Sequence, residues 1–144
     1  MVEDLHPLVE QRLRQADQRY TAGRRAMIEL LVQAARPISI GDIAALDPSM
    51  ARSSAYRHLV DLQQAGVVRR ISASDEFARF ELSEDLTEHH HHLLCVSCGR
   101  VVDVSPPPAL ERAVARALVD LTAREHFDAH SHRLDVFGVC RECR

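Results

Sequence analysis

Four cysteines in two pairs constrain this chain more than any other feature of its sequence. Cys95 and Cys98 form one C-x-x-C pair, Cys140 and Cys143 form the other, and the 144 residues contain no further cysteine. Two such pairs supply the four thiolates that tetrahedral zinc prefers. The alternative is a redox dithiol, but that chemistry uses one C-x-x-C at the start of a helix, whereas each pair here follows a strand-like run. The spacing therefore predicts a structural zinc site without an open position for catalysis.

The composition is that of a small globular protein. Hydrophobic residues make up 46% of the chain and charged residues 27%, which excludes a disordered chain. The length allows about one domain, or two small ones, and excludes a large multidomain enzyme. No apolar run approaches the ~20 residues that span a bilayer, and the start MVEDLHP lacks a signal-peptide pattern. We therefore expect a cytoplasmic protein with no membrane contact, in which thiols stay reduced and bind metal.

Residues 1–82 show the order of elements of a winged helix-turn-helix. Apolar residues recur at helical spacing in four runs, of which Ser39 can cap the third. The fourth covers about 50–65 and ends at Gly66, a residue suited to a left-handed C-terminus. The runs VVRRI and FARFEL then read as the strands of a hairpin at 67–82. This order predicts a DNA-binding domain whose wing is the hairpin.

The second half of the chain has a different pattern. The polar stretch 83–88 lacks any periodicity and is predicted to be a hinge. Residues 89–144 then read as two strands, a helix introduced by three prolines, and a further strand. A domain this small rarely stabilises itself by a core alone, so we expect a structural metal and a dimer partner. The predicted fold is thus α+β, a winged helix-turn-helix followed by a small α/β dimerisation domain with a four-cysteine zinc site.

Four consecutive histidines stand directly before the first cysteine pair. Alternate side chains of a strand face opposite sides, so His90 and His92 would serve one site and His89 and His91 another. Neutral imidazole is a common metal ligand, and the alternative is a solvated polar stretch. Further candidate ligands, each of a type more often found at the surface, are Glu81, Asp85, Asp103, Glu111, His126, His130 and His132.

The expected fourth helix carries a segment without acidic residues until Asp61. Arginine can bind guanine or phosphate, serine can bind phosphate, and a tyrosine ring can touch thymine methyl groups. The alternative is an ordinary amphipathic helix with a polar exposed face. Neither half of the chain is basic overall, so a DNA-binding face must be local, and Arg69 and Arg70 could extend it onto the wing. The predicted DNA contacts are Arg52, Ser53, Ser54, Tyr56, Arg57, Arg24 and Arg25.

Taken together, these motifs resemble those of the ferric uptake regulator (Fur) family of metal-responsive repressors over nearly the whole chain. TAGRRAMIELL at 21–31 is similar to the family's T-x-x-R-x-x-[IV]-[LV] helix, and SSAYRHLVDLQQAGVV at 53–68 is similar to its recognition helix. HHHHLLCVSCGRVVDV and FGVCRECR resemble the family's histidine and cysteine motifs, and this half is most similar to zinc uptake regulators. The resemblance implies a homodimer that binds a palindromic, AT-rich DNA operator when its sensory metal is bound.

The resemblance also implies two metal sites besides the four-cysteine zinc. The hinge sensory site would take His90 and His92 with Glu81, and with Asp85 or Asp103 as further donors. A second, peripheral site, as in zinc-type members, would take His89, His91, Glu111 and His132. Zinc-sensing relatives add a cysteine near 83–85, and iron- and peroxide-sensing relatives add a histidine before the third helix. This chain has neither, so its hinge donors are nitrogen and oxygen only, which suits zinc, iron(II), manganese or nickel.

We therefore expect a zinc-responsive transcriptional repressor of metal-uptake genes rather than an enzyme. Zn²⁺ would be structural, and Zn²⁺ or Fe²⁺/Mn²⁺ would be regulatory, favouring a closed arrangement that spaces two recognition helices for successive major grooves. An iron(II)- or manganese/peroxide-responsive regulator of the same family is the alternative. A zinc hydrolase is disfavoured because the chain lacks H-E-x-x-H, and a metal-storage protein would leave the helix-turn-helix without a use.

Overall fold

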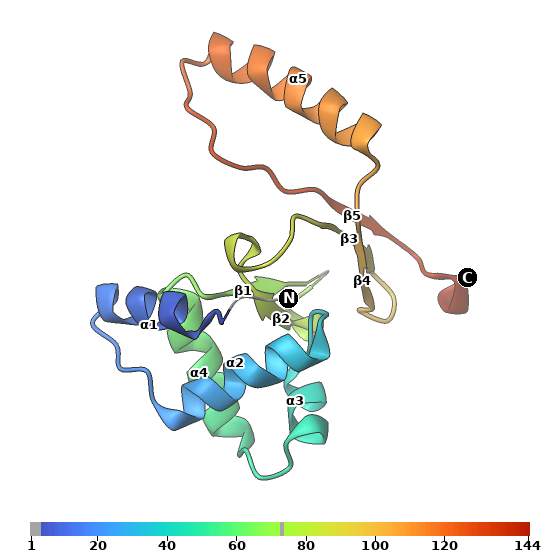
Figure 1. Cartoon of the computed structure of the whole chain (residues 1–144). Coiled ribbons are helices and arrows are strands. Elements are labelled where there is room, and N and C mark those ends of the chain that lie inside the picture. The colour runs from blue at the N-terminus through green and yellow to red at the C-terminus, as the bar shows by residue number, and fades with distance from the viewer. Residues whose placement is uncertain (1–3, 73) are drawn as a thin grey trace.

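The computed structural model describes residues 4–72 and 74–144. Residues 1–3 of the predicted DNA-binding domain and Ala73 of the predicted wing turn lie outside these ranges. The chain forms two lobes joined by a waist (Figure 1). The winged lobe contains four helices and a hairpin, and the second lobe contains a three-stranded sheet and one long helix. The predicted α+β class is confirmed.

Local signals mark one end of three of the four helices in the winged lobe. Ser39 caps the third helix in a reciprocal capping box with Asp42, as the sequence predicted for Ser39. The side chain of Thr21 accepts a hydrogen bond from the backbone of Arg24 at the start of the second helix. Gly66 takes φ +70° after the fourth. The helices are α1 (His6–Gln15), α2 (Ala22–Ala34), α3 (Ile40–Leu46) and α4 (Arg52–Gln64).

The wing is fastened to these helices by a shared core. Its strands β1 (Val68–Ile71) and β2 (Arg79–Leu82) are antiparallel, and a short 3₁₀ turn, η1 (Asp75–Phe77), precedes β2. An isolated bridge between Ile38 and Phe80 attaches the segment before α3 to β2. Helices and strands together bury one apolar cluster, which includes Val9, Leu13, Met27, Ile28, Ile43, Leu59, Leu62 and Val67. The wing therefore shares the hydrophobic core of the winged lobe, and packing against the helices fixes the position of residues on β2.

The second lobe is built around one central strand. Strand β3 (His91–Cys95) lies between β4 (Val101–Val104), which is antiparallel to it, and β5 (Asp135–Gly138), which is parallel to it. Strand β3 begins with His91 and His92 and ends with Cys95. Because β4 and β5 pair with β3 on its two sides, they fix the positions of these potential metal ligands. Helix α5 (Pro108–Arg124) connects β4 to β5 and stands away from the sheet (Figure 1), with none of its residues buried.

The predicted hinge, 83–88, contains one short 3₁₀ helix, η2 (Glu84–Leu86), and is held against the winged lobe. The hydroxyl of Ser83 donates to the carbonyl oxygen of Gly66 over 2.8 Å, and Arg12 of α1 donates to the same oxygen over 2.7 Å. Arg12 also pairs with Asp85 of η2. Within the described residues, no helix is long and apolar enough to cross a membrane.

Candidate metal centres and nucleic-acid interface

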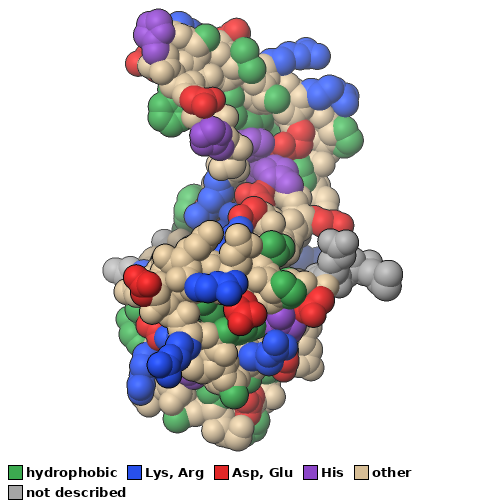
Figure 2. All heavy atoms as spheres, turned by 60° about the vertical axis from the view of Figure 1, so that its left-hand side comes forward, with side chains coloured by type: hydrophobic (Ala, Val, Ile, Leu, Met, Phe, Trp, Pro, Cys, Tyr) green, Lys and Arg blue, Asp and Glu red, His purple; other side chains and the backbone are tan. Residues whose placement is uncertain are grey.

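Potential metal ligands converge at three places in the described part of the chain. In each cluster, four residues offer one donor atom apiece, and these atoms lie within 4.8 Å of one another. Histidine and acidic side chains gather at the waist between the lobes (Figure 2). We call the clusters the cysteine cluster (Cys95, Cys98, Cys140, Cys143), the hinge cluster (Glu81, His90, His92, Asp103) and the peripheral cluster (His89, His91, Glu111, His132).

The cysteine cluster forms because β3 and β5 are parallel neighbours that end at the same edge of the sheet. Cys95 ends β3 and Cys98 follows in the turn. After β5, Cys140 precedes the 3₁₀ turn η3 (Arg141–Cys143) and Cys143 ends it. All four are free thiols, and the backbone N–H of Cys140 donates to the Cys95 sulfur over 3.3 Å. That bond helps to lower the pKa of Cys95 to about 6, which favours the thiolate that binds metal. The predicted four-cysteine cluster is confirmed, and it fits structural zinc.

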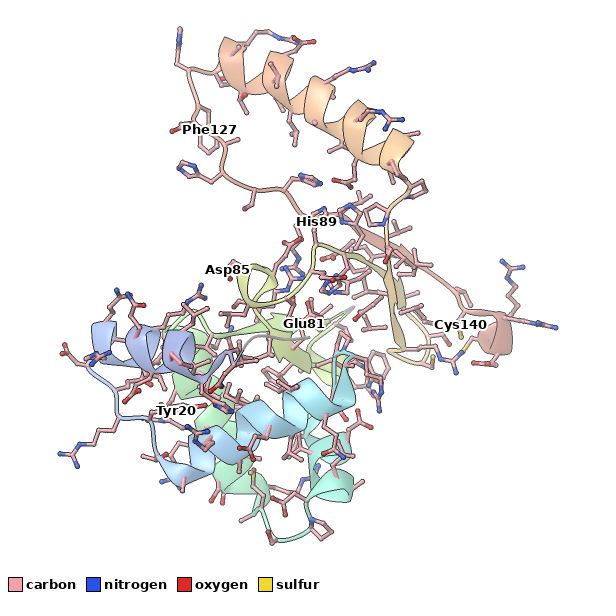
Figure 3. All side chains as sticks on the ribbon, viewed as in Figure 1. Tyr20, Glu81, Asp85, His89, Phe127 and Cys140 are labelled. Atoms are coloured by element: carbon pink, nitrogen blue, oxygen red, sulfur yellow. The ribbon has the colours of Figure 1, made fainter. Side chains whose placement is uncertain are left out.

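The hinge cluster joins the two lobes. Glu81 comes from β2 of the winged lobe, while the other three residues come from β3, β4 and the segment before β3. One Glu81 oxygen, Oε1, lies 3.1 Å from His92 Nε2, and the other, Oε2, lies 3.2 Å from His90 Nε2. An Asp103 oxygen lies 3.6 Å from His92 Nε2. Two imidazoles and two carboxylates thus converge between the lobes, and Figure 3 shows Glu81 at this junction.

Both histidines of the hinge cluster are oriented through their second ring nitrogen. His92 Nδ1 lies 3.0 Å from an oxygen of Asp135, its partner in the register of β3 and β5. His90 Nδ1 lies 2.8 Å from the backbone carbonyl oxygen of Glu88. Each bond leaves Nε2 directed at the cluster, as the outer partners of metal-binding histidines do. The sequence did not indicate Asp135, because only the pairing of two distant strands brings it to His92.

Burial and charge act in opposite directions on this cluster. Burial alone would raise the pKa of Glu81, but the hydrogen bond with His92 and the positive charge of Arg69 outweigh it and lower that pKa to about 2. Burial would lower the pKa of His92, yet its bonds with Glu81 and Asp135 raise it. Burial and the charge of Glu81 raise the pKa of Asp103. The lowered pKa keeps the Glu81 carboxylate ionised beside two imidazoles, and a carboxylate with imidazoles is a donor set that suits a divalent cation.

Two residues lie elsewhere than the sequence suggested. Asp85, a candidate hinge donor, lies on η2 (Figure 3) and is not brought into the hinge cluster, because its carboxylate pairs with Arg12 of α1. Arg69, expected to carry charge to DNA from the wing, points instead to Glu81, with Nε 2.6 Å from Oε1. Antiparallel register explains this contact, since Arg69 and Glu81 are directly opposite in the hairpin.

The peripheral cluster is centred on Glu111 of α5. One of its oxygens lies 2.6 Å from His91 Nε2, and the other lies 3.2 Å from both His89 Nε2 and His132 Nε2. His132 Nε2 is buried and makes no hydrogen bond among the described residues. A buried nitrogen that lies beside a carboxylate without a hydrogen bond to it fits a metal ligand. The remaining candidates, His126 and His130, lie in the loop after α5 and join none of these clusters.

The expected recognition helix, α4, presents most of its predicted DNA contacts to solvent. Arg52, Ser53, Tyr56 and Arg57 are exposed, Ser54 is half-buried, and Ala55, Leu59 and Leu62 face the core. Arg25 is exposed and lies over the Tyr20 ring at 5.2 Å from its centroid. The prediction for Arg24 needs correction, because its guanidinium donates to Asp61 of α4 over 2.7 Å and is largely buried. Arg24 holds α2 against α4 instead of pointing outwards.

A winged helix with an exposed face on α4, joined to a second lobe at clusters of potential metal ligands, is the architecture expected of a metal-responsive DNA-binding regulator. The family model described as the ferric uptake regulator family matches residues 15–137. The peroxide-responsive repressor PerR of Staphylococcus aureus is 31% identical over 137 residues, covering 92% of this chain and 86% of PerR. The chain therefore belongs to the ferric uptake regulator family. Members of this family are transcriptional regulators that bind DNA as dimers and are not enzymes.

Solved structures agree with this assignment at the level of the fold. The ferric uptake regulator of Helicobacter pylori superposes with a TM-score of 0.72 at 21% identity, covering 99% of this chain and 95% of that one. The ferric uptake regulator of Vibrio cholerae superposes with a TM-score of 0.69 at 26% identity, covering 91% and 98%.

Proposed function

We propose that this chain is a transcriptional repressor whose DNA binding depends on a metal ion at the hinge cluster, and that the ion is zinc. The main support for the proposal is that the potential metal ligands of the hinge cluster come from both lobes. Glu81 belongs to the wing, whereas His90, His92 and Asp103 belong to the second lobe and its entry segment. A bound divalent cation supplies positive charge and directional bonds, so it favours the arrangement in which the lobes meet at these donors.

In the proposed mechanism, metal binding increases the population of the closed arrangement of the two lobes, which is the arrangement that binds DNA. The chain acts as a homodimer on a palindromic, AT-rich operator, with Arg52, Ser53, Tyr56 and Arg57 of each α4 facing DNA. Closure at the hinge cluster sets the distance between the two copies of α4 to match successive major grooves. A coupling free energy of about 1–3 kcal/mol changes operator affinity ~5–150-fold. Such a repressor acts in the cytoplasm on genes of metal uptake.

Zinc is favoured by the donors and by the second half of the sequence. Two imidazole nitrogens and two carboxylate oxygens make a four-donor set of the kind zinc accepts. The histidine and cysteine motifs of residues 89–144 resemble those of zinc uptake regulators. The second candidate is an iron(II)- or manganese-dependent, peroxide-responsive repressor. The 31% identity with PerR favours it, and the same donor types also bind those ions.

Fluorescence anisotropy with a palindromic AT-rich duplex tests the proposal. The protein retains zinc only at its cysteine cluster and is titrated with buffered free Zn²⁺, Fe²⁺, Mn²⁺ or Ni²⁺. Activation by zinc in the sub-nanomolar range, with the other ions needing far more, supports the zinc proposal. Activation by iron or manganese at micromolar levels, with no specific effect of zinc, supports the second candidate.

Substitutions in the hinge cluster test where the ion acts. In His90→Ala and His92→Ala, we expect operator affinity to lose its dependence on added metal while the cysteine cluster keeps its zinc. His130→Ala is the matched control, because His130 is 84% exposed at its side chain and lies outside all three clusters. Operator binding that still responds to metal in both hinge variants refutes this assignment.

A further inference from the structure

Arg69 lies against the hinge cluster from the wing side. Its Nε is 2.6 Å from Glu81 Oε1, and both side chains are largely buried, at 17% and 8% exposure. The pair is directly opposite across the hairpin, so the backbone register of β1 and β2 maintains the contact. A carboxylate this buried needs a positive partner, and a guanidinium keeps its charge at any physiological pH.

The same carboxylate is the donor that the winged lobe offers to a metal. Glu81 Oε1 lies near His92 Nε2 as well as near Arg69, while Oε2 lies near His90 Nε2. A divalent cation bound among these atoms would stand beside a fixed positive charge in a poorly solvated place. Repulsion between like charges is strong there, because little water screens it. A metal bound there would therefore compete with Arg69 for the negative charge of Glu81.

A second carboxylate is within reach of Arg69. Glu84 of η2 has an oxygen 3.5 Å from Arg69 Nη1, and its side chain is 20% exposed. The remaining nitrogen, Arg69 Nη2, is buried and has no hydrogen-bond partner among the described residues. The guanidinium is thus only partly satisfied at Glu81, and a small shift towards Glu84 would give it a second full carboxylate contact.

We propose that Arg69 is an internal cation that competes with metal for Glu81, moves to Glu84 when metal binds, and so sets the metal affinity of the hinge cluster. This inference rests on the proposed function only in taking the hinge cluster as a metal site. Without metal, Arg69 neutralises Glu81 and holds the buried carboxylate in place. With metal, the ion neutralises Glu81 and Arg69 pairs with Glu84. Arg69 is then an affinity-determining residue that does not itself bind the metal.

Metal affinity measured without DNA tests this role. Zinc binding is followed by competition with a chelator of known affinity, and the hinge step is the one that His92→Ala abolishes. We expect Arg69→Gln to bind zinc at least about tenfold more tightly, because a nearby positive charge is removed. Arg70→Gln is the matched control, since it removes the same charge from the next, exposed residue of β1, and we expect less than about a threefold change there. Unchanged or weaker zinc binding in Arg69→Gln overturns the proposal.

Two further variants separate charge from folding and test the exchange of partners. Arg69→Lys keeps the charge, so its zinc affinity should stay near that of the unmodified protein, and circular dichroism checks the fold of every variant. Glu84→Gln should weaken the hinge step of zinc binding in the unmodified background and have no such effect in the Arg69→Gln background. Only the hinge step is compared, because Glu84 also contacts His89 of the peripheral cluster. An equal effect of Glu84→Gln in both backgrounds contradicts the movement to Glu84.

The inference and the proposed function can fail separately. If Arg69→Gln tightens zinc binding but operator affinity ignores zinc, the repressor mechanism fails and the role of Arg69 stands. If operator affinity follows zinc but Arg69→Gln binds zinc like the unmodified protein, the repressor mechanism stands and the role of Arg69 fails.

Discussion

Single side chains in the hinge cluster owe their charge state to very few partners. Glu81 stays ionised in a buried place because His92 and Arg69 both contact its Oε1. His92 in turn stands between two carboxylates, Glu81 and Asp135, with its ring completely buried. These groups titrate in opposite senses, so acid and base should weaken the metal-free protein for different reasons.

The first prediction at the residue scale concerns pH. The pKa of Glu81 is lowered from 4.5 to about 2, so its contribution is present above pH 4.5 and is lost as pH falls towards 2. The pKa of His92 is raised from 6.5, so its contribution is present below pH 6.5 and is lost as pH rises through the raised value. With empty hinge and peripheral clusters, the free energy of unfolding should therefore be largest between pH 4.5 and 6.5. The shift of Glu81 corresponds to about 3 kcal/mol, and this includes the contact with His92.

Urea unfolding across this pH range measures the effect. In Glu81→Gln, the free energy of unfolding should fall less steeply as the pH drops below 4.5. Saturating zinc should remove the alkaline decline, because a bound ion needs the imidazoles neutral and so favours higher pH. If the free energy of unfolding of the metal-free protein keeps rising from pH 6 to 8, the charge states inferred for the hinge cluster are wrong.

The second residue-scale prediction concerns Asp135, which positions His92 without facing the metal. Asp135→Ala should lower zinc affinity of the hinge cluster ~10–100-fold, as is usual for the outer partner of a metal-binding histidine. Asp135→Asn should lose less zinc affinity than Asp135→Ala, because its amide oxygen can still accept a hydrogen bond from His92 Nδ1. The matched control is Asp128→Asn, at a carboxylate whose side chain is 92% exposed. Equal zinc affinity in Asp135→Ala and the control would show that Asp135 does not position His92.

At the scale of elements, the turn of the first cysteine pair rests on the wing. Arg79 of β2 donates its Nε to the carbonyl oxygen of Gly99 over 2.8 Å and its Nη1 to Asp42 of α3 over 3.2 Å. Gly99 itself has φ +73°, and a Cβ built there would come within 2.3 Å of the Phe77 side chain. The wing strand therefore links the cysteine cluster to the helix-turn-helix through direct contacts.

Gly99→Ala tests this docking. Positive φ costs an alanine roughly 1–2 kcal/mol, and the Phe77 ring must also move, so we expect a loss of about 1–3 kcal/mol in the free energy of unfolding. Phe77→Ala in the same chain should restore the steric part of that loss and leave the backbone part. The matched control is Gly66→Ala, where φ is +70° but a Cβ meets nothing within 4 Å, so only the backbone part of the loss should appear. If Phe77→Ala gives no such recovery, Phe77 does not pack on Gly99 in solution.

Over the whole molecule, local patterns predicted the elements better than the contacts between them. The cap at Ser39 and the stop at Gly66 depend on neighbouring residues. The alternation of His89–His92 depends only on β3 and the residues just before it, so all three features were accessible from the sequence. Asp135 reaches His92, and Arg79 reaches Gly99, only through strand register and the contact between the lobes. Asp85 was misjudged for the same reason, since its partner Arg12 lies 73 positions away in α1.

The second lobe has apolar surface that one chain does not cover. Strand β5 is an edge strand of its sheet, and its neighbouring residues Val136 and Phe137, which face opposite sides, are 48% and 55% exposed. Helix α5 buries none of its 17 residues and leaves Val119 and Leu121 65% and 51% exposed. An amphipathic helix draws most of its stability from packing, and an open strand edge with apolar neighbours favours pairing with a second chain.

We therefore predict that Phe137→Asp converts the protein from a dimer to a monomer. A buried unpaired carboxylate opposes association, while the exposed position of Phe137 in a single chain lets that chain keep its fold. Analytical ultracentrifugation measures the mass, and Leu8→Asp, at a residue of the winged lobe that is 52% exposed, is the matched control and should remain a dimer. The monomer should also lose most of its operator affinity even with zinc bound, because two copies of α4 must be held one helical turn of DNA apart. A Phe137→Asp protein that stays dimeric would place the interface away from β5.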